Sequence, residues 1–457
     1  MKPFHVQRNV IALVWGSLLL VGTDHAFGQD ALDRLKPDYL QRMREARERF
    51  ALQRQAVANE GSISQDSYRS VRANLHVHSE LSHDSRGKIE DIVAAAKRAG
   101  TEVLMFTEHP SKEKDFYLDG NQGIRDEVLL IPGAEMKGML VFPTLSLRPY
   151  ESSEPIDLAR LVRTRGGHVF LSHLEERMDW EIPGLSGVEI YNTHADFKKQ
   201  KRMVEAMKNP LWLVKLGELV KEYPQEVFSA LQSYPDDYLK RWDELNQIAP
   251  HCGVAANDAH QNVGVRIRLK DADSVSVEDP IGEVLLTLPK LLAAPVIKIP
   301  SDAMPGNLLF SLQLDPYECS LRHAGTHLLV KEFSREGVWD ALENRRAFVA
   351  FDWLADAKGF NAWVVDASDL IGPAVHSIGS RVRWSDDLHW VAHAPLNCDW
   401  RLLRNGSVVV ETKGSEFKER LIEPGIYRIE AWLTVGEEKL PWILSNPIFV
   451  QEGDDGG

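Results

Sequence analysis

The sequence is poor in cysteine. Among its 457 residues there are three, Cys252, Cys319 and Cys398, which lie far apart in the chain. None of them belongs to a CxxC pair, so the sequence excludes a cysteine-type zinc site and a disulfide framework. One disulfide between two of the three stays open, and the spacing does not say which.

The sequence also lacks a run of apolar residues long enough to span a bilayer. Its longest, VIALVWGSLLLVG at 10–22, is shorter than the roughly 20 residues that a membrane helix needs. Lys2 and Arg8 precede the run, and the small residues Ala26 and Gly28 follow it. This pattern is typical of a secretory signal peptide, and a membrane anchor is the alternative. We expect residues 1–28 to be a signal peptide. The mature protein is then expected to be periplasmic or secreted, without stable insertion in a membrane after cleavage.

Positively charged residues are outnumbered by negatively charged ones. The chain has 53 Lys and Arg against 67 Asp and Glu, a formal net charge of −14. Such a protein is a poor general binder of nucleic acid, so no nucleic-acid partner is expected. We expect a small-molecule substrate, and an anionic one would need a local source of positive charge. The composition does not indicate an oligomeric state.

The remaining pattern suggests a mixed α/β chain with an all-β end. Residues 29–69 predict an N-terminal helical segment, either one helix or two broken at Pro37, packed loosely on the rest. From about residue 70, short apolar strands alternate with helices, which predicts a parallel sheet, open or closed into a barrel. The strands are expected at 71–79, 102–109, 127–136, 168–174, 187–192 and 253–258, and helices at 88–100 and 156–167. Residues 265–320 contain several prolines and give no clear pattern.

The last hundred residues alternate with a period of two. Asn405-Gly406 between two such runs is a strong hairpin signal. Several short strands with turn signals predict a β-sandwich over 353–452, after an α/β unit over 70–352. The tail 453–457 is expected to be disordered.

Residues 74–85, NLHVHSELSHDS, raise the question of a metal site. On a strand, His76 and His78 point to the same face. Asp84 follows in the loop after the carboxyl end of that strand, where active sites of parallel α/β folds lie. An HxH pair alone is weak evidence. We expect Asp84 to be a ligand and its neighbour His83 to be a bystander.

Repetition of the pattern carries more weight than the pair. Nearly every expected strand delivers an imidazole or a carboxylate at its carboxyl end. Together with the three residues of the segment 74–85, the candidate metal ligands are His76, His78, Asp84, His109, Glu135, His173, His194, Asp258 and His260. Glu108 is expected to orient a ligand, and Glu189 is either a buried partner of the site or an ordinary strand residue. The remaining histidines singled out, at 168, 251, 323, 327, 389 and 393, are expected to be structural or ordinary.

Imidazole and carboxylate without thiolate suit Zn, Mn or Fe(II). Eight or nine candidates exceed the needs of one ion, so two or three divalent metals are implied. A two-metal site lowers the pKa of bound water to about 7 and supplies positive charge, so no Ser or Cys nucleophile is required. Ser85-Arg86-Gly87-Lys88 fits the rival SxxK motif, but the sequence lacks its companion motifs.

The motifs resemble those of the polymerase-and-histidinol-phosphatase (PHP) superfamily. NLHVHSELSHDS, FTEHP, IPGAEM, LSHLE, GVEIYN and NDAH occur in the family's order over roughly 70–350. The resemblance implies a distorted (β/α)7 TIM-like barrel with two or three metals at its rim, and an Ig-like β-sandwich after it. It makes His76 and His78 the opening pair of ligands, Glu135 the carboxylate that bridges two metals, and Asp258 and His260 the closing pair.

The same resemblance matches Asp84, His109 and His173 to ligands and leaves His194 as the least secure one. Asn74 stands where the family often has Asp, and Glu108 where Asp is usual. Glu135, Asp258 and His260 are the residues expected to serve catalysis. Arg86, Lys112, Lys137 and Arg177 lie in loops where they could bind a substrate anion, although a plain surface role fits each of them.

The expected function is that of an exported metal-dependent hydrolase. A phosphoesterase with a metal-bridging hydroxide as its nucleophile comes first, whether phosphatase or phosphodiesterase. The same site acting on a carbamate, carboxylic ester or amide is one alternative, because fold does not fix substrate. An extracellular glycan- or partner-binding protein with an incidental barrel is the other.

Overall fold

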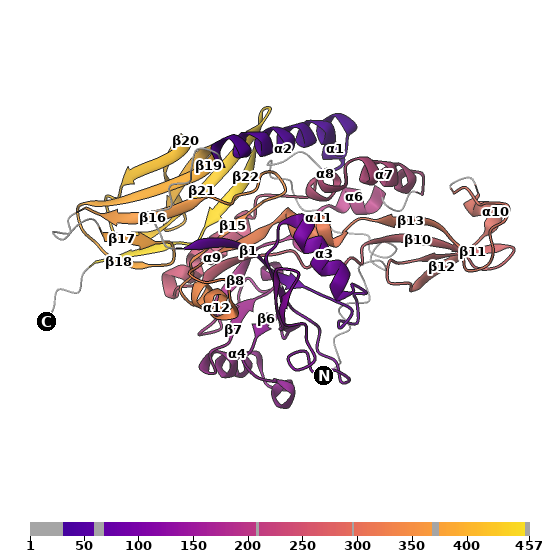
Figure 1. The fold of residues 1–457 in the computed structure, drawn as a ribbon, viewed down its shortest axis with the longest axis horizontal. Coiled ribbons are helices and arrows are strands. Elements are labelled where there is room, and N and C mark those ends of the chain that lie inside the picture. Colours follow the sequence, from indigo (N-terminus) through magenta and orange to yellow (C-terminus); the bar gives the residue numbers. More distant parts are fainter. Residues whose placement is uncertain (1–30, 59–67, 207–209, 295–296, 368–373, 453–457) are drawn as a thin grey trace.

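The computed structural model describes residues 31–58, 68–206, 210–294, 297–367 and 374–452. The expected signal peptide and the C-terminal tail lie outside these ranges. Among the described helices, none is long and apolar enough to cross a membrane. The molecule is elongated, with a β-rich end, a central α/β part and a thin arm opposite the β-rich end (Figure 1).

The first half of the α/β part is built on parallel strands. β1 (Arg69–Val77) pairs with β2 (Val103–Phe106), and β2 pairs with β4 (Val128–Ile131). The short β3 (Gly123–Arg125) adds an antiparallel edge. Between β1 and β2 runs α3 (Ile89–Ala99), within the predicted range, and it ends at Gly100, whose left-handed φ of 80° suits glycine. Its apolar face, including Ile92 and Ala96, packs on these strands.

A second, five-stranded sheet forms the other half. Its order is β5-β6-β7-β8-β9, and β7, β8 and β9 are parallel. The strands are β5 (Ala134–Met136), β6 (Met139–Phe142), β7 (His168–Leu171), β8 (Gly187–Asn192) and β9 (Cys252–Ala256). The connecting helices are α4 (Pro155–Thr164), α5 (Thr193–Lys199), α6 (Lys201–Ala206), α7 (Pro210–Glu222), α8 (Pro224–Ser229) and α9 (Asp236–Ile248), with single 3₁₀ turns at Arg148–Tyr150 and Leu174–Glu176.

The strand predicted over 127–136 is wrong as a single element. It divides into β4 and β5, which belong to different sheets. Pro132 between them has no N–H to donate to a strand ladder. A Cβ on Gly133 would lie 2.8 Å from the carbonyl oxygen of Phe106 and 2.7 Å from that of Val141. The chain changes sheets at this close backbone approach.

The distorted (β/α)7 barrel that the resemblance implies stays a prediction, because the described strands show no closed barrel. The two sheets meet through two isolated parallel bridges, Val77 with Ala259 and Glu108 with Ala134. Antiparallel pairs also interrupt the expected parallel series, at β5–β6 and β6–β7. The mixed α/β class is confirmed. Among the described strands, the two sheets pair only at these bridges, and they also share a buried core that includes Leu75, Phe170 and Val254.

The sheet of β1 continues into the C-terminal β-rich region. β14 (Gly325–Val330) pairs with β1, β15 (Ala347–Ala350) with β14, and β22 (Glu438–Ser445) with β15. The other strands of this region are β16 (Asn361–Asp366), β17 (Ala374–Ser377), β18 (Arg381–Arg383), β19 (Leu388–Arg404), β20 (Ser407–Arg420), β21 (Gly425–Val435) and β23 (Ile448–Gln451). Asn405 and Gly406 form the predicted hairpin turn, with φ of 51° and 81°. The β-rich end is confirmed, and its Ig-like topology stays a prediction.

The N-terminal segment forms two helices, α1 (Ala31–Arg34) and α2 (Pro37–Ala58), and Pro37 is the first residue of the second. We expected loose packing, and the structure differs. Leu40, Met43, Ala46 and Phe50 share one face of α2 and are buried. The helix lies along the C-terminal strands (Figure 1). A helical spacing of large apolar residues accounts for this firm contact.

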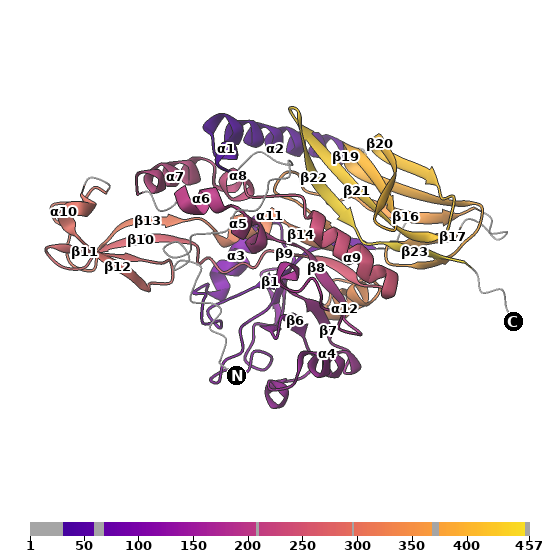
Figure 2. The ribbon, with the colours of Figure 1, turned by 180° about the vertical axis from the view of Figure 1, so that it is seen from behind.

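The segment 265–320 gave no pattern in the sequence, and its described strands, which lie between Gly264 and Gln313, form an antiparallel arm (Figure 2). Its strand order is β12-β11-β10-β13. The elements are β10 (Gly264–Leu269), β11 (Ser274–Glu278), β12 (Val284–Pro289), α10 (Lys290–Ala293) and β13 (Leu308–Gln313). α11 (Tyr317–His323) and α12 (Arg335–Glu343) follow in the α/β part.

Candidate metal centre

The two bridges between the sheets gather the candidate ligands. At the first bridge the His78 N–H donates to the carbonyl of Ala259 (3.0 Å), and the Ala259 N–H donates to the carbonyl of His76 (3.2 Å). The bridge residues Val77 and Ala259 each lie between two candidates, so this pairing alone brings together His76, His78, Asp258 and His260. At the second bridge, Glu108 precedes His109 and Ala134 precedes Glu135.

Four side chains form a first group, His76, Glu135, His173 and Asp258. Each offers a nitrogen or oxygen atom, and these atoms lie within 4.8 Å of one another. His76 Nε2 is 3.1 Å from Asp258 Oδ1 and 3.3 Å from Glu135 Oε2. His173 Nε2 is 3.1 Å from Glu135 Oε1. The first group thus has two imidazoles and two carboxylates facing a common point.

A second group consists of His78, Asp84, His109 and His260, again with its ligand atoms within 4.8 Å of one another. Asp84 Oδ2 is 3.2 Å from His109 Nε2 and 3.4 Å from His260 Nε2. The rings of His78 and His260 are stacked with their centroids 3.8 Å apart. Three imidazoles and one carboxylate therefore converge beside the first group.

Two carboxylates of the first group also reach the second. Glu135 Oε2 lies 3.7 Å from His78 Nε2 and 3.8 Å from His109 Nε2. Asp258 Oδ1 lies 3.5 Å from His78 Nε2. The two groups therefore share their acidic side chains, as the donor set of a two-metal site requires.

His194 lies beside the groups and belongs to neither. Its Nδ1 is 3.4 Å from Asp258 Oδ2, and its ring centroid is 5.9 Å from that of His173. It stands in the first turn of α5, whose N-cap is Asn192. Eight of the nine candidate ligands thus converge in two groups of four, and the ninth borders them.

Buried polar atoms without a hydrogen bond show that the groups suit a cation. Among the described residues, Asp84 Oδ1, Asp258 Oδ1 and His260 Nε2 make no hydrogen bond, although each lies within 3.9 Å of a histidine nitrogen or a carboxylate oxygen. Buried carboxylate oxygens are costly when nothing donates to them. Imidazole nitrogen with carboxylate oxygen is a donor set for Zn, Mn or Fe. The residues present therefore fit divalent metal ions.

Comparison with known proteins agrees with this geometry. Residues 74–249 match the family model described as the PHP domain. This chain contains a PHP domain. The match includes the ligand candidates from His76 to His194 and ends before Asp258 and His260.

No curated protein matches the chain significantly. Among solved structures, the chain is similar to a two-domain protein from Bacteroides vulgatus described as containing a predicted PHP-like metal-dependent phosphoesterase. The two share 14% identity over 84% of this chain and 97% of that one, with a TM-score of 0.35. A likeness at this level carries no argument about fold or function. The PHP domain and the two groups of side chains together support a metal-dependent hydrolase.

Behind the candidate ligands lies Glu189, for which the sequence left two roles open, a buried partner of the site or an ordinary strand residue. It lies in β8 with no exposed surface. Its Oε1 is 2.7 Å from His76 Nδ1, and its Oε2 accepts the backbone N–H of His173 at 2.8 Å. Carboxylates in this position fix the orientation of a ligating imidazole. Glu189 therefore supports two members of the first group at once.

Ser82 plays the corresponding part in the second group, and sequence reasoning missed it. Its hydroxyl donates to Glu108 Oε2 (2.8 Å), lies 3.0 Å from His78 Nδ1, and accepts the backbone N–H of His109 (3.0 Å). Glu108 also accepts from the hydroxyl and the N–H of Ser79. Glu108 thus acts on the ligands through Ser82, in line with its expected orienting role. Only the proximity of Ser82 to the HxH pair could have signalled it.

Glu175 was missed as well. One of its oxygens lies 3.4 Å from His173 Nδ1, on the side of the ring away from Glu135. Tyr238 on α9 donates its hydroxyl to the other oxygen. These contacts lower the pKa of the Glu175 carboxyl to about 2, because hydrogen bonds and the charge of His173 outweigh its burial. The sequence LSHLE contains this residue but gives no signal for its contact with a distant tyrosine.

Burial and mutual charge act in opposite directions on the clustered histidines. Burial lowers the pKa of His78 to about 3, and the neighbouring His260 adds to the effect. For His260 itself, burial is outweighed by Asp258 and Asp84, which raise its pKa to about 9. The Glu135 carboxyl has a pKa well below its usual value, since His76 and His173 overcome its burial. The centre therefore keeps its carboxylates ionised.

Two candidate ligands have unusual backbone conformations. His173 has a φ of 46° and Asp258 a φ of 50°, in the left-handed region that non-glycine residues rarely adopt. Such residues cluster where the surrounding structure holds them for function. Both come directly after strands of the second sheet, so the turn at each strand end aims the side chain into the groups.

The other residues singled out in the sequence lie outside the groups. The His83 side chain is 65% exposed, as expected of a bystander, and Asn74 is buried in hydrogen bonds with Asn257 and Thr101. Arg86 and Arg177 donate to nearby backbone carbonyls, and the exposed Lys112 and Lys137 lie in loops. The histidines at 168, 251, 323, 327, 389 and 393 all contact groups remote from the centre.

Proposed function

We propose that the protein is a metal-dependent phosphoesterase whose centre holds two divalent ions between the two groups of side chains. The observation that carries this proposal is the sharing of Glu135 and Asp258 between the groups. A carboxylate within reach of both positions is what a pair of ions about 3.5–4 Å apart requires. Mn, Zn and Fe all suit the donor set, and His194 is available to a third ion.

When bound, two such ions activate a water molecule and offset the negative charge of an anionic substrate. The side chains of the protein position these ions and orient the imidazoles that would bind them. Glu135 and Asp258 hold the two positions together, and His260 lies against both Asp84 and Asp258. Glu189, Ser82 and Glu175 keep the imidazoles turned toward the centre. A phosphoester is proposed because it is anionic and the protein as a whole is acidic. Two bound cations at this centre would supply the positive charge that such a substrate needs.

The same centre acting on a carbamate, carboxylic ester or amide is the alternative. An extracellular binding protein with an idle α/β part is a weaker one, because an idle site has no need of eight converging ligands and of Glu189 behind them. The proposed substrate is a small anionic molecule.

Metal analysis and three substrates test the proposal. The purified chain should carry Mn, Fe or Zn, lose activity with a chelator, and hydrolyse p-nitrophenyl phosphate or its diester faster than p-nitrophenyl acetate. His76→Ala should lose both metal and hydrolysis, while His389→Ala on β19 should lose neither. A chain with only trace metal and an unchanged rate in His76→Ala would overturn the enzyme assignment, and ester turnover without phosphoester turnover would favour the alternative.

We further propose that the protein is exported and cleaved near Gly28, on the evidence of the basic start and apolar run of residues 1–28. Expression of the full chain in a bacterial host, followed by mass analysis of the periplasmic product, tests this. A product beginning near residue 29 is expected. Full-length protein retained in the membrane or cytoplasm would contradict export.

A further inference from the structure

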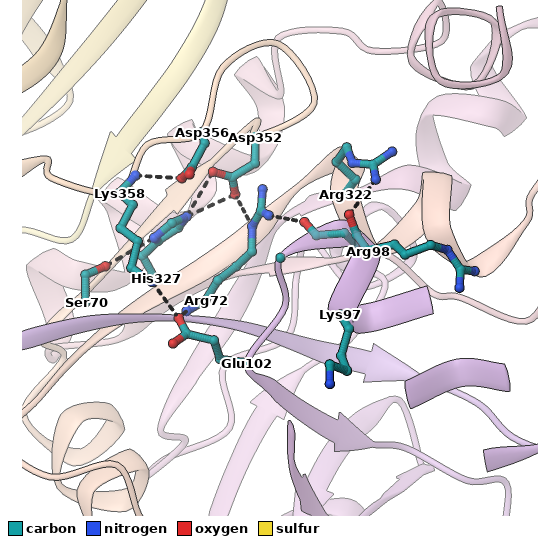
Figure 3. A pocket seen from close by; sticks show the side chains of 12 residues that line it. Ser70, Arg72, Lys97, Arg98, Glu102, Arg322, His327, Asp352, Asp356 and Lys358 are labelled. Carbon is teal, nitrogen blue, oxygen red and sulfur yellow. Dashed lines mark hydrogen bonds and ion pairs between the residues drawn. The ribbon is translucent and has the colours of Figure 1, made fainter. Parts of the chain in front are cut away.

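The α/β part has a cavity of about 290 Å³, which Figure 3 shows with its lining side chains. It is lined at the amino-terminal ends of β1 and β2, by Arg72 and Glu102 among others. The metal-binding candidates of β1 stand four or more residues further along, roughly 13 Å at the rise of a strand. The cavity is therefore separate from the centre.

Basic side chains dominate this cavity. Arg72, Lys97, Arg98, Arg322 and Lys358 line it, together with the carboxylates of Glu102, Asp352 and Asp356. Figure 3 shows these side chains arriving from β1, from the end of α3, from α11 and from the segment after β15. Such an accumulation stands out in a chain whose net charge is −14.

The carboxylates already have partners. Asp352 accepts from Arg72 Nε (2.7 Å), from His327 and from the backbone of Ala357. Glu102 pairs with Lys358 at 3.2 Å and with Arg69. The neighbouring pairs are Arg54 with Asp356, Arg98 and Arg322 with Glu318, and Lys97 with Glu127. With all these partners counted, seven basic side chains face five carboxylates, so positive charges outnumber negative charges by two in this set.

Arg72 is the buried member of the set, with 6% of its surface exposed. Its Nη1 donates to the carbonyl of Ala99, but its buried Nη2 has no hydrogen-bond partner among the described residues. Burial lowers the pKa of this guanidinium to about 10, against the effect of nearby carboxylates. Gly325 makes room for its stem, because a Cβ there would lie 2.9 Å from Arg72 Cγ. A desolvated guanidinium with an unused donor gains from a negative charge beside it.

We propose that this cavity is a binding site for a small oxyanion of the phosphate class. The anion lies beside the head of Arg322, whose side chain is 23% exposed, above the buried Arg72. An oxygen that reaches the floor of the cavity gives Nη2 the acceptor it lacks. Guanidinium groups recognise phosphate through paired, charge-assisted hydrogen bonds, which a chloride ion cannot reproduce.

Equilibrium dialysis of radiolabelled inorganic phosphate against the full chain tests this site. The metal-loaded protein and the chelator-treated protein are compared at constant ionic strength in chloride. One saturable phosphate per chain should remain after the metal is removed, because the cavity does not depend on the metal centre. A chain that fails as a metalloenzyme could still bind this phosphate, so the two proposals fail separately.

Variants locate the binding. Arg322→Gln at the rim and Arg72→Lys, which keeps the charge but not the fork, should each weaken phosphate binding to the metal-free chain at least about tenfold. Arg383→Gln on β18, an exposed arginine elsewhere, is the matched control and should leave binding unchanged. If Arg72→Lys does not fold, Arg322→Gln decides. Absence of saturable binding to the metal-free chain, or affinity unchanged in a folded Arg322→Gln, would overturn the proposal.

Discussion

His76 is held between two carboxylates, with Nδ1 2.7 Å from Glu189 Oε1 and Nε2 3.1 Å from Asp258 Oδ1. One ring nitrogen thus faces the candidate metal centre while the other is fixed from behind. Because Glu189 lies on β8 and His76 on β1, their contact couples the second sheet to the first behind the centre, and Glu189 also accepts the N–H of His173. Its role is to orient ligands, and its loss should be visible in metal binding.

Replacing Glu189 by Gln keeps the size of the side chain but removes its charge. The amide can still accept the N–H of His173, so the fold should persist. Without the carboxylate, the His76 ring should be held less firmly and be less basic. Metal affinity is therefore expected to fall about 10–100-fold. Competition with a chromophoric chelator measures this affinity directly.

Glu416→Gln is the matched control for that experiment. Glu416 also pairs with a histidine, at 2.6 Å from His393 Nδ1, but on the exposed surface of the β-rich end. Its replacement should leave metal affinity unaltered. Equal affinities of the Glu189→Gln variant and the wild type would show that Glu189 is an ordinary strand residue.

Ser82→Ala should affect the second group more than the first. The hydroxyl contacts His78, the backbone of His109 and Glu108, all on the side of the second group. Its loss leaves the buried Glu108 with fewer donors and His78 free to turn. We expect the ion held by the second group to be lost, with affinity down about tenfold or more. Metal content per chain after gel filtration should therefore drop by about one ion, and loss of both ions or of neither would contradict this division of roles.

Much of the site was predictable from the sequence because strand ends position their side chains locally. His76 and His78 share a face, and the DxH pair at Asp258 follows its strand in the same way. What the sequence did not show depends on contacts between distant segments. Ser82 and Glu175 act through residues with which they share no sequence pattern, and Tyr238 reaches Glu175 from α9.

The fold was predicted less completely for a similar reason. The alternation of strands and helices fixes the α/β class, but strand partners depend on tertiary packing. Pro132 and Gly133 are residue types that interrupt a strand, so the break could be predicted from the sequence. The change of sheet that follows it could not. The arm escaped prediction since its strands are short and interrupted by turns, and Pro289 stands at the end of β12, where a strand is not expected from the sequence.

Ser85→Ala distinguishes a metal-activated water from a serine nucleophile. The Ser85 hydroxyl is buried, donates to the carbonyl of His260 (3.0 Å) and lies 2.8 Å from the hydroxyl of Tyr317, whereas Lys88 of the same SxxK motif is exposed. We expect hydrolysis to continue at nearly the wild-type rate, with stability lower by about 1 kcal/mol. Removal of a true serine nucleophile costs about a million-fold in kcat. A loss of that size in a folded Ser85→Ala would restore the serine-hydrolase reading.

His323 should make the stability of the protein fall with acid. It is fully buried on α11, where Nε2 lies 2.7 Å from the Tyr191 hydroxyl and Nδ1 3.0 Å from that of Ser229. Burial lowers its pKa to about 3, against about 6.5 in an unfolded chain. Between these values the unfolded state binds a proton that the folded state does not. The contribution of His323 is therefore fully present above pH 6.5 and is lost as the pH falls toward 3, at about 1.4 kcal/mol per pH unit.

The variant His323→Gln removes this titration while keeping hydrogen-bonding capacity. Its stability at pH 7 should be lower than that of the wild type, but it should decline less steeply between pH 6.5 and pH 4.5. Urea unfolding of chelator-treated protein at a series of pH values measures both slopes without interference from metal release. His389→Gln, at a histidine on β19 that contacts only a nearby backbone carbonyl, should keep the wild-type slope. Parallel curves for His323→Gln and the wild type would show that the buried imidazole is not the group that takes up the proton on unfolding.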